Sequence, residues 1–368
     1  MNAVRLTKTA TGPLDRLRVD IVGSLLRPPP LRASAAAHRA GEITDADLIH
    51  IQDAAVVDVL RTQQDLGMPV LVDGEFRRST FMDSFAEVAG FEELASNLWA
   101  AHVRRALDTG RSGRVEAPSA AGRTAATRPL RLTRNRPRED YEFARDHAEA
   151  PVKVTLIGPD RIFQMFDAAG SREVYPEPAD FLRDVVRVQR EMITGLVEAG
   201  CRYVHIDAPG LTAYIDPPTL ERMRDAGQDP VRVLQRGIEA ENAVIADFPG
   251  VTFGVHLCRG NEQGHWHREG SYDAIAEQLF GQLAHHRLLV EYDTERAGGF
   301  EPLRYVPDTT TVVLGLVTTK SGEIETVDLL RRRIEEAARY VPLDRLAISP
   351  QCGFASTIEG NPITEDDQ

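Results

Sequence analysis

The sequence predicts a single α/β domain over residues 1–368, folded as a (β/α)8 TIM barrel. Apolar, β-rich runs alternate along the chain with segments of helical period, and there are eight such runs. Most are near-continuous apolar stretches, as expected for strands of a parallel sheet that is covered on both faces. Eight strand–helix units are the number that closes into a barrel. An open doubly wound sheet is the alternative, but residues 22–30 (VGSLLRPPP) lack its glycine-rich G-x-G-x-x-G turn.

The expected elements follow one another in a regular order. Strands are predicted at 19–24, 70–75, 153–159, 203–209, 251–258, 287–293, 310–317 and 346–353. Helical periodicity predicts helices at about 45–66, 179–199 and 326–339. Thr44 and Asp47 form a candidate capping box at the start of the first helix, and Gly67 is a candidate stop at its end.

Two regions depart from this alternation. Residues 104–138 contain ten arginines, no lysine and only two acids, Asp108 and Glu116. We expect residues 100–150 to be an Arg-rich insertion after the second strand–helix unit, either a solvated loop or a basic lid over an anionic substrate. After the last strand the acidic cluster 365–368 resembles the first turn of a helix, so we expect the closing helix to be cut short or another segment to cover that face.

The composition restricts the class of protein. Hydrophobic residues make up 42% of the chain and charged residues 27%, which excludes a disordered or fibrous protein. The net charge of −13 disfavours nucleic acid or an anionic membrane as the main partner. No apolar run approaches the roughly 20 residues that span a bilayer, and the N-terminus lacks the apolar core of a secretory signal. Three cysteines do not make a disulfide framework, which indicates reduced thiols in a cytoplasmic protein.

Polar and sulfur-containing residues stand at the ends of the predicted strands. In a barrel these ends surround one mouth, where the loops build the active site. The residues in question are Ser24, Glu75, Asp207, His256, Cys258, Glu291 and Cys352.

His256 and Cys258 are two residues apart, so on a strand their side chains share one face. The barrel would bring Cys352 to the same mouth. Two thiolates and an imidazole suit Zn2+, and a carboxylate such as Glu291 can complete a tetrahedron. The alternative is a core histidine beside an inert buried cysteine.

Three segments resemble the zinc-site motifs of cobalamin-independent methionine synthase. They are GVHLCRGN (254–261), LLVEYD (288–293) and SPQCGFAS (349–356), in the order His-x-Cys, Glu, Cys. VGS (22–24), VDGEFRRSTF (72–81) and HIDAP (205–209) resemble the homocysteine-binding segments of that family. The likeness is greatest to the short, single-barrel members, which correspond to the catalytic C-terminal half of the full-length synthase. Epoxyalkane:coenzyme M transferase resembles the same group.

The resemblance implies roles for these residues. His256, Cys258, Glu291 and Cys352 would bind zinc. Ser24 would hold the carboxylate of homocysteine, and Glu75 and Asp207 its ammonium. The chemistry is consistent, since an alkyl thiol is mostly protonated near neutral pH and zinc deprotonates a bound thiol. The methyl donor would be a reduced folate or a methylated corrinoid carrier.

The sequence departs from the full-length pattern at several points. It lacks the N-terminal barrel, which puts binding of a polyglutamylated folate in doubt. Ala208 stands where full-length members have glutamate. Thr318, Thr319 and Lys320 replace a proton-donating histidine, so Lys320 is a candidate proton donor or anion contact; the alternative is a surface lysine. Arg27 is a candidate clamp for a carboxylate or sulfonate, or a solvated side chain.

Three functions therefore compete. The first is zinc-dependent methyl transfer to homocysteine. The second is the same zinc chemistry with another electrophile, such as the opening of an epoxide by coenzyme M. The third is a barrel whose zinc is purely structural and which acts as a binding protein.

Overall fold

The structure, a computed structural model, describes residues 14, 16–91 and 123–368. Its centre is a parallel sheet of six strands that lie side by side in chain order. These strands are β3 (Val154–Ile157), β4 (Tyr203–Asp207), β5 (Thr252–Leu257), β6 (Arg287–Glu291), β7 (Thr311–Val317) and β8 (Leu346–Pro350). All six predicted strands from 153 onward are thereby confirmed, each one to three residues shorter than expected. Their central residues are buried, which explains why they are continuous apolar runs in the sequence.

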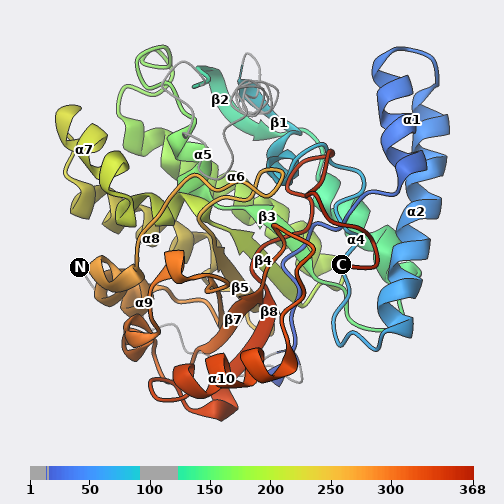
Figure 1. Cartoon of the computed structure of the whole chain (residues 1–368). Coiled ribbons are helices and arrows are strands. Elements are labelled where there is room, and N and C mark those ends of the chain that lie inside the picture. The colour runs from blue at the N-terminus through green and yellow to red at the C-terminus, as the bar shows by residue number, and fades with distance from the viewer. Residues whose placement is uncertain (1–13, 15, 92–122) are drawn as a thin grey trace.

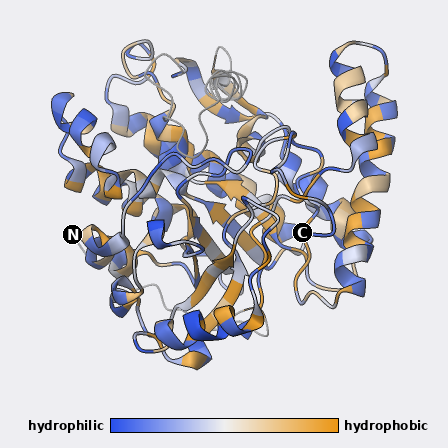
Figure 2. Cartoon of the chain, in the orientation of Figure 1, coloured by the Kyte–Doolittle hydropathy of each residue, from blue (hydrophilic) through white to orange (hydrophobic). Residues whose placement is uncertain are grey.

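Helices and short 3-10 turns connect the strands and lie around the sheet (Figure 1). The helices are α1 (Pro29–Arg39), α2 (Asp45–Asp65), α4 (Arg136–Asp146), α5 (Pro159–Gln164), α6 (Pro178–Glu198), α7 (Pro217–Asp225), α8 (Pro230–Ile245), α9 (Ala276–Gln282) and α10 (Val327–Ala337). The 3-10 turns are η2 (Phe81–Phe85), η4 (Pro209–Ile215), η5 (Tyr272–Ala274), η6 (Glu295–Ala297), η7 (Glu301–Tyr305) and η8 (Leu343–Arg345). Figure 2 shows the sheet as the most hydrophobic part of the ribbon, with hydrophilic residues concentrated on the surrounding helices.

The three helices expected from periodicity are α2, α6 and α10. The capping box at the start of α2 is confirmed, because the Thr44 side chain accepts from the backbone N–H of Asp47 and the Asp47 carboxylate accepts from the backbone N–H of Thr44. α6 buries one face against the sheet through residues that include Val185, Val188 and Met192.

The first two expected strands, 19–24 and 70–75, form no regular strand. Segment 19–24 makes a single parallel bridge, Val19 to Ile348 of β8. Segment 70–75 makes one parallel bridge, Leu71 to Val152 just before β3. The two segments meet where the N–H of Leu25 donates to the carbonyl of Gly74, 3.1 Å away. They therefore extend the two edges of the sheet towards each other, although their ladder hydrogen bonds are too few for a strand.

Part of the Arg-rich stretch has regular structure. β2 (Ala126–Leu132) pairs antiparallel with β1 (Val88–Phe91), and α4 follows directly. The interpretation of residues 100–150 as one loop or lid is therefore wrong for the strand and the helix that they contain. Residues 100–122, with several of the arginines, lie outside the described part of the chain.

A buried ionic cluster ties segment 19–24 to the sheet. The carboxylate of Asp20 pairs with the ammonium of Lys153 and the guanidinium of Arg287, each at 2.9 Å, and accepts from the Tyr203 hydroxyl at 2.6 Å. The side chains of Asp20, Lys153 and Arg287 have no exposed area. Although burial alone would raise it, Lys153 and Arg287 hold the pKa of Asp20 far below its usual range.

The last fifteen residues, 354–368, contain no helix. The resemblance of the acidic cluster to a helical turn is limited to a local turn, in which Thr364 and Asp367 exchange hydrogen bonds. This segment folds back over the N-terminal region, where the side chain of Gln368 accepts from the N–H of Leu26. Among the residues that the structure describes, every helix is too short or too polar to cross a lipid bilayer.

Candidate metal centre and pocket

Three of the predicted metal ligands converge at the carboxyl ends of the strands. His256 lies within β5, Cys258 directly follows that strand, and Cys352 is two residues beyond the end of β8. One ligand atom from each lies within 4.8 Å of the other two. All three side chains are buried, and both cysteines carry free thiols. Parallel strands of one sheet end at the same edge, which is why residues almost a hundred positions apart meet here.

The environment of these three residues fits a metal ion. Neither ring nitrogen of the buried His256 has a nitrogen or oxygen partner among the described residues, and the ring interacts with the thiol of Cys258. Buried polar atoms are normally satisfied, so an imidazole whose polar neighbours are thiols is typical of a ligand position. The hydrogen bond from the Cys352 thiol and the charge on His256 lower the pKa of Cys258, which favours the thiolate that a metal requires. Nitrogen and sulfur donors in this combination match zinc.

Glu291, the expected fourth ligand, is close by but is not part of this group. Its Oε2 accepts from the backbone N–H of Arg259 at 2.5 Å. Its Oε1 pairs with Arg296 at 2.5 Å and faces the Lys320 ammonium at 3.6 Å. Burial would raise its pKa, but Lys320, Arg259 and Arg296 bring the pKa of Glu291 down to about 2. The side chain is therefore a carboxylate at neutral pH, held by cations rather than by the metal group.

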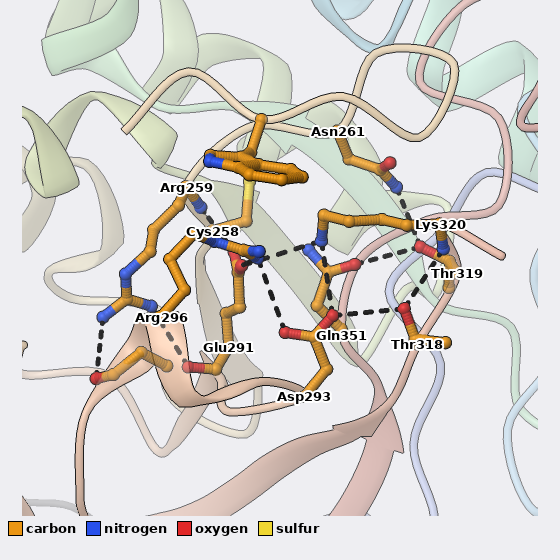
Figure 3. A network of polar contacts seen from close by, with 12 residues as sticks. Cys258, Arg259, Asn261, Glu291, Asp293, Arg296, Thr318, Thr319, Lys320 and Gln351 are labelled. Atoms are coloured by element: carbon orange, nitrogen blue, oxygen red, sulfur yellow. Dashed lines mark hydrogen bonds and ion pairs between the residues drawn. The ribbon is translucent and has the colours of Figure 1, made fainter. Parts of the chain in front are cut away.

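Lys320 belongs to the network around Glu291. Its ammonium also faces the Oδ2 of Asp293 at 3.5 Å, and Figure 3 shows it between these two acids. It is absent from the residues that line the pocket described next. The interpretation of Lys320 as a solvated surface residue is wrong, since only 9% of its side chain is exposed. Lys320 therefore pairs with Glu291 and Asp293 and does not line the pocket.

A pocket opens directly beside His256, Cys258 and Cys352, which we call the metal group. Its cavity volume is about 60 Å³. The lining includes His256, Cys258 and Cys352 together with three more of the residues predicted from strand ends, Ser24, Glu75 and Asp207. Apolar side chains such as Phe81 and Pro209 complete part of the wall. Three of the four predicted zinc ligands and three of the four predicted substrate contacts therefore share one small cavity, without Glu291 and Arg27.

One carboxylate oxygen of Glu75 is hydrogen-bonded, and the other has no partner among the described residues. Its Oε1 accepts from the Thr155 hydroxyl at 2.5 Å and faces Arg78 at 3.4 Å. Its Oε2 is buried and has no partner among the described residues. Burial raises the pKa of Glu75, against the opposing effect of Arg78. The residue also has a φ of 58°, a left-handed conformation that is strained for a side chain of this size. Glu75 therefore contacts Arg78 through one oxygen and keeps the other oxygen without a partner among the described residues.

Asp207 and Ser24 line the same pocket as Glu75. An oxygen of Asp207 lies 3.3 Å from the Nε2 of His205, and burial raises the pKa of Asp207. The backbone of Ser24 accepts from the N–H of Phe354. A Cβ added to Gly353 would lie 2.0 Å from the Ser24 hydroxyl, so glycine is needed where the loop after β8 passes this serine.

Arg27 does not serve the pocket. Its guanidinium is buried and donates to four backbone carbonyls, those of Glu75, Arg78, Ala355 and Thr357. The structure therefore does not support either expectation for this residue, a clamp for a substrate anion or a solvated side chain. Instead Arg27 ties the loop that carries Glu75 to the segment after Cys352.

Sequence reasoning missed several polar residues in the wall, among them Arg161, Asn261 and Arg268. The amide of Asn261 donates to the carbonyl of Gly353 at 2.9 Å and to the hydroxyl of Thr319 at 2.8 Å, which links the loops after β5, β7 and β8 (Figure 3). It stands inside the GVHLCRGN motif, which was a usable signal. Arg161 lies in α5 and Arg268 in the loop after β5, and neither stands in a motif that gave such a signal.

Comparisons with known proteins agree with this architecture. Residues 19–242 and 291–363 match the family described as the catalytic domain of cobalamin-independent synthase. The uncharacterized protein YxjG of Bacillus subtilis is 37% identical, covering 95% of this chain and 90% of its own length. A methionine synthase of Sulfolobus acidocaldarius is 29% identical over 92% of this chain and 86% of its own. The crystal structure of a putative vitamin-B12 independent methionine synthase from Listeria monocytogenes superposes with a TM-score of 0.71 at 27% identity, covering 93% of this chain and 92% of that one.

Proposed function

The chain belongs to the family of cobalamin-independent methionine synthase catalytic domains, and from that premise we propose that it is a zinc-dependent methyltransferase that methylates homocysteine. One observation carries the proposal: His256, Cys258 and Cys352 come together in the wall of the cavity that Ser24, Glu75 and Asp207 also line. A cluster of sulfur and nitrogen donors open to a cavity is typical of a catalytic metal site, whereas structural zinc sites are closed.

We further propose that segments 19–24 and 70–75 complete a (β/α)8 barrel. The hydrogen bond between Leu25 and Gly74 and the bridges to β8 and β3 support a closed ring of eight parallel segments. This arrangement would explain why Ser24 and Glu75 reach the same cavity as residues of β4, β5 and β8.

The metal-binding part of the proposal assigns zinc to His256, Cys258 and Cys352. Glu291 is the candidate fourth ligand, and reaching the metal requires its carboxylate to leave Arg296. Bound zinc would supply the deprotonation of the thiol and a fixed position for its sulfur. Lys320 and Arg296 keep Glu291 ionised and hold it at the edge of the centre.

The remaining residues would orient the acceptor. The buried, unpartnered Oε2 of Glu75 and the carboxylate of Asp207 are suited to the ammonium of homocysteine, since an ammonium taken out of water needs a partner. The Ser24 hydroxyl would donate to its carboxylate. In the reaction the thiol loses its proton, the bond between the methyl group and its donor breaks, and a carbon–sulfur bond forms. The donor would be a reduced methylfolate or a methylcorrinoid carrier.

The test is a matrix of donors and acceptors. Purified protein with measured zinc content is incubated with homocysteine, coenzyme M or another thiol, in the presence of methylfolate, methylcorrinoid or an epoxide. Mass spectrometry then identifies any thioether. We expect methionine from homocysteine and one of the methyl donors. A thioether formed only from coenzyme M and an epoxide would replace this function with the alternative alkylation, and zinc-loaded protein that forms none would favour a structural zinc.

A further inference from the structure

Two arginine side chains line the pocket, and the proposed methyl transfer assigns neither of them a role. Arg161 lies in α5, which begins directly after β3. Arg268 lies in the loop after β5, ten residues beyond the proposed ligand Cys258, and only 8% of it is exposed. Two cationic groups therefore face a small cavity from opposite sides of β4.

The contacts of Arg268 differ from those of two nearby structural arginines. In Arg27 and Arg259 both terminal nitrogens donate to backbone carbonyls. In Arg268 only Nη1 donates, to the carbonyl of Pro209 and the hydroxyl of Thr212. Its buried Nε has no partner in the described part of the chain. Arg268 is thus anchored at one nitrogen, which leaves donors of the guanidinium for another acceptor.

Arg268 also makes no direct ion pair among the residues that the structure describes, although the charges of Asp216 and Asp160 partly oppose the lowering of its pKa by burial. Within the described residues no carboxylate forms an ion pair with it. Buried charges are normally paired because removing an ion from water costs several kcal/mol. Burial and, next, the charge of Arg268 lower the pKa of Arg161 to about 10, so the two cations lie close enough to repel each other. An anion held between them would relieve both the desolvation and the repulsion.

We propose that Arg161 and Arg268 form an oxyanion-binding wall of the pocket, which receives a carboxylate, sulfonate or phosphate group of one of the two reacting substrates. The assignment of that anion to a substrate rests on the proposed methyl transfer. The same chemistry has two sources, the thiol acceptor and the methyl donor. Planar guanidinium groups favour such groups because they donate two parallel hydrogen bonds to them.

A binding experiment tests the wall without any turnover. Sulfate, which has neither a thiol nor a methyl group, is titrated calorimetrically into the protein at constant ionic strength. We expect Arg268→Gln and Arg161→Gln each to weaken sulfate binding by at least about tenfold, as for the loss of a charged hydrogen-bond partner. Arg268→Lys should restore part of it because the charge is kept. Arg232→Gln is the matched control, since Arg232 is 89% exposed and pairs with Asp229 on the surface.

Kinetics then identify the source of the anion. If the acceptor carries it, the variants raise KM for homocysteine and leave KM for the donor unchanged; if the donor carries it, the pattern reverses. The proposed oxyanion-binding wall would be wrong if the wild-type protein binds no sulfate, or if both glutamine variants bind sulfate as the wild type does. If Arg268→Gln does not fold, Arg161→Gln decides alone, since its helix α5 is anchored by other contacts. If sulfate binds through the arginines but no thiol is alkylated, the methyl-transfer proposal is wrong and the oxyanion-binding wall stands.

Discussion

At the scale of single residues, substitution of the cysteines in the metal group tests the proposed zinc site most directly. We predict that Cys258→Ser and Cys352→Ser each lose most of the bound zinc, because a hydroxyl is a poor substitute for a thiolate. Cys201→Ser is the matched control, since Cys201 is a buried thiol outside the metal group. Zinc is measured by elemental analysis of the purified, dialysed variants. Full occupancy in both ligand variants would remove the proposed site.

The ammonium contacts give a second residue-scale prediction. Glu75→Gln and Asp207→Asn should each weaken the use of homocysteine by about 2 kcal/mol, the usual range for removing a buried charged partner. Zinc content should stay unchanged because neither residue belongs to the metal group. Coenzyme M has no ammonium and serves as the control thiol, since its use should hardly respond. Normal values of kcat/KM for homocysteine in both variants would contradict the assignment.

Sequence reasoning found the residues that stand at strand ends and missed those that depend on loops. His256, Cys258 and Cys352 could be predicted because the end of a parallel strand fixes where a side chain lies. The contacts of Arg27 could not, because they are carbonyls brought together by tertiary folding. Arg268 was missed for the same reason, as its loop has no periodicity to read.

At the scale of elements, the loop after β8 and segment 19–24 depend on each other. Because a Cβ at Gly353 would lie 2.0 Å from the Ser24 hydroxyl, we predict that Gly353→Ala turns that hydroxyl away from the pocket. KM for homocysteine should rise, and urea unfolding should show a loss of about 1–3 kcal/mol, as for overpacking. Gly281→Ala is the control, since Gly281 lies in α9 with no atom closer than 3.8 Å to the added carbon.

A double-mutant cycle separates this effect from general damage. Ser24→Ala alone should raise KM for homocysteine by a similar factor. If Gly353→Ala acts through the Ser24 hydroxyl, the two changes together should cost little more than either one. Additive effects on KM would show that the added methyl group disturbs the pocket by another route.

Elements with strong local signals could be predicted, and those held by tertiary contacts could not. α2 has both amphipathic periodicity and the capping box of Thr44 and Asp47, and it begins where expected. Segment 70–75 has the composition of a strand, yet after Leu71 the backbone of Val72 bonds to the side chain of Gln63. Gly74 and Glu75 then adopt positive φ and leave the extended conformation. β2 could not be predicted because its exposed positions include Arg128, Pro129 and Arg131, which give no clear alternation, and its partner β1 is distant in sequence.

At the scale of the whole molecule, the N-terminal segment is held in place by charge as well as by packing. Asp20 contacts Lys153 just before β3, Tyr203 of β4 and Arg287 of β6, so one carboxylate joins the N-terminal segment to three parts of the sheet. Only two bridges and a few hydrogen bonds connect segments 19–24 and 70–75 to the sheet edges. We therefore infer that the ionic cluster helps to fix the position of segment 19–24, and with it the position of Ser24 in the pocket.

We predict that Asp20→Asn destabilises the protein by about 3–5 kcal/mol at neutral pH, because it leaves two buried cations without their counter-charge. The pKa of Asp20 is lowered in the folded state from an ordinary value of 3.8. Its contribution is therefore complete above that value and is lost as the pH falls below it, because the unfolded state then binds the proton first. Urea unfolding of both proteins between neutral and acid pH measures this: the difference in unfolding free energy should be constant at neutral pH and shrink below about pH 4. A difference that is small at neutral pH, or that does not shrink in acid, would mean that packing alone holds segment 19–24 beside β8.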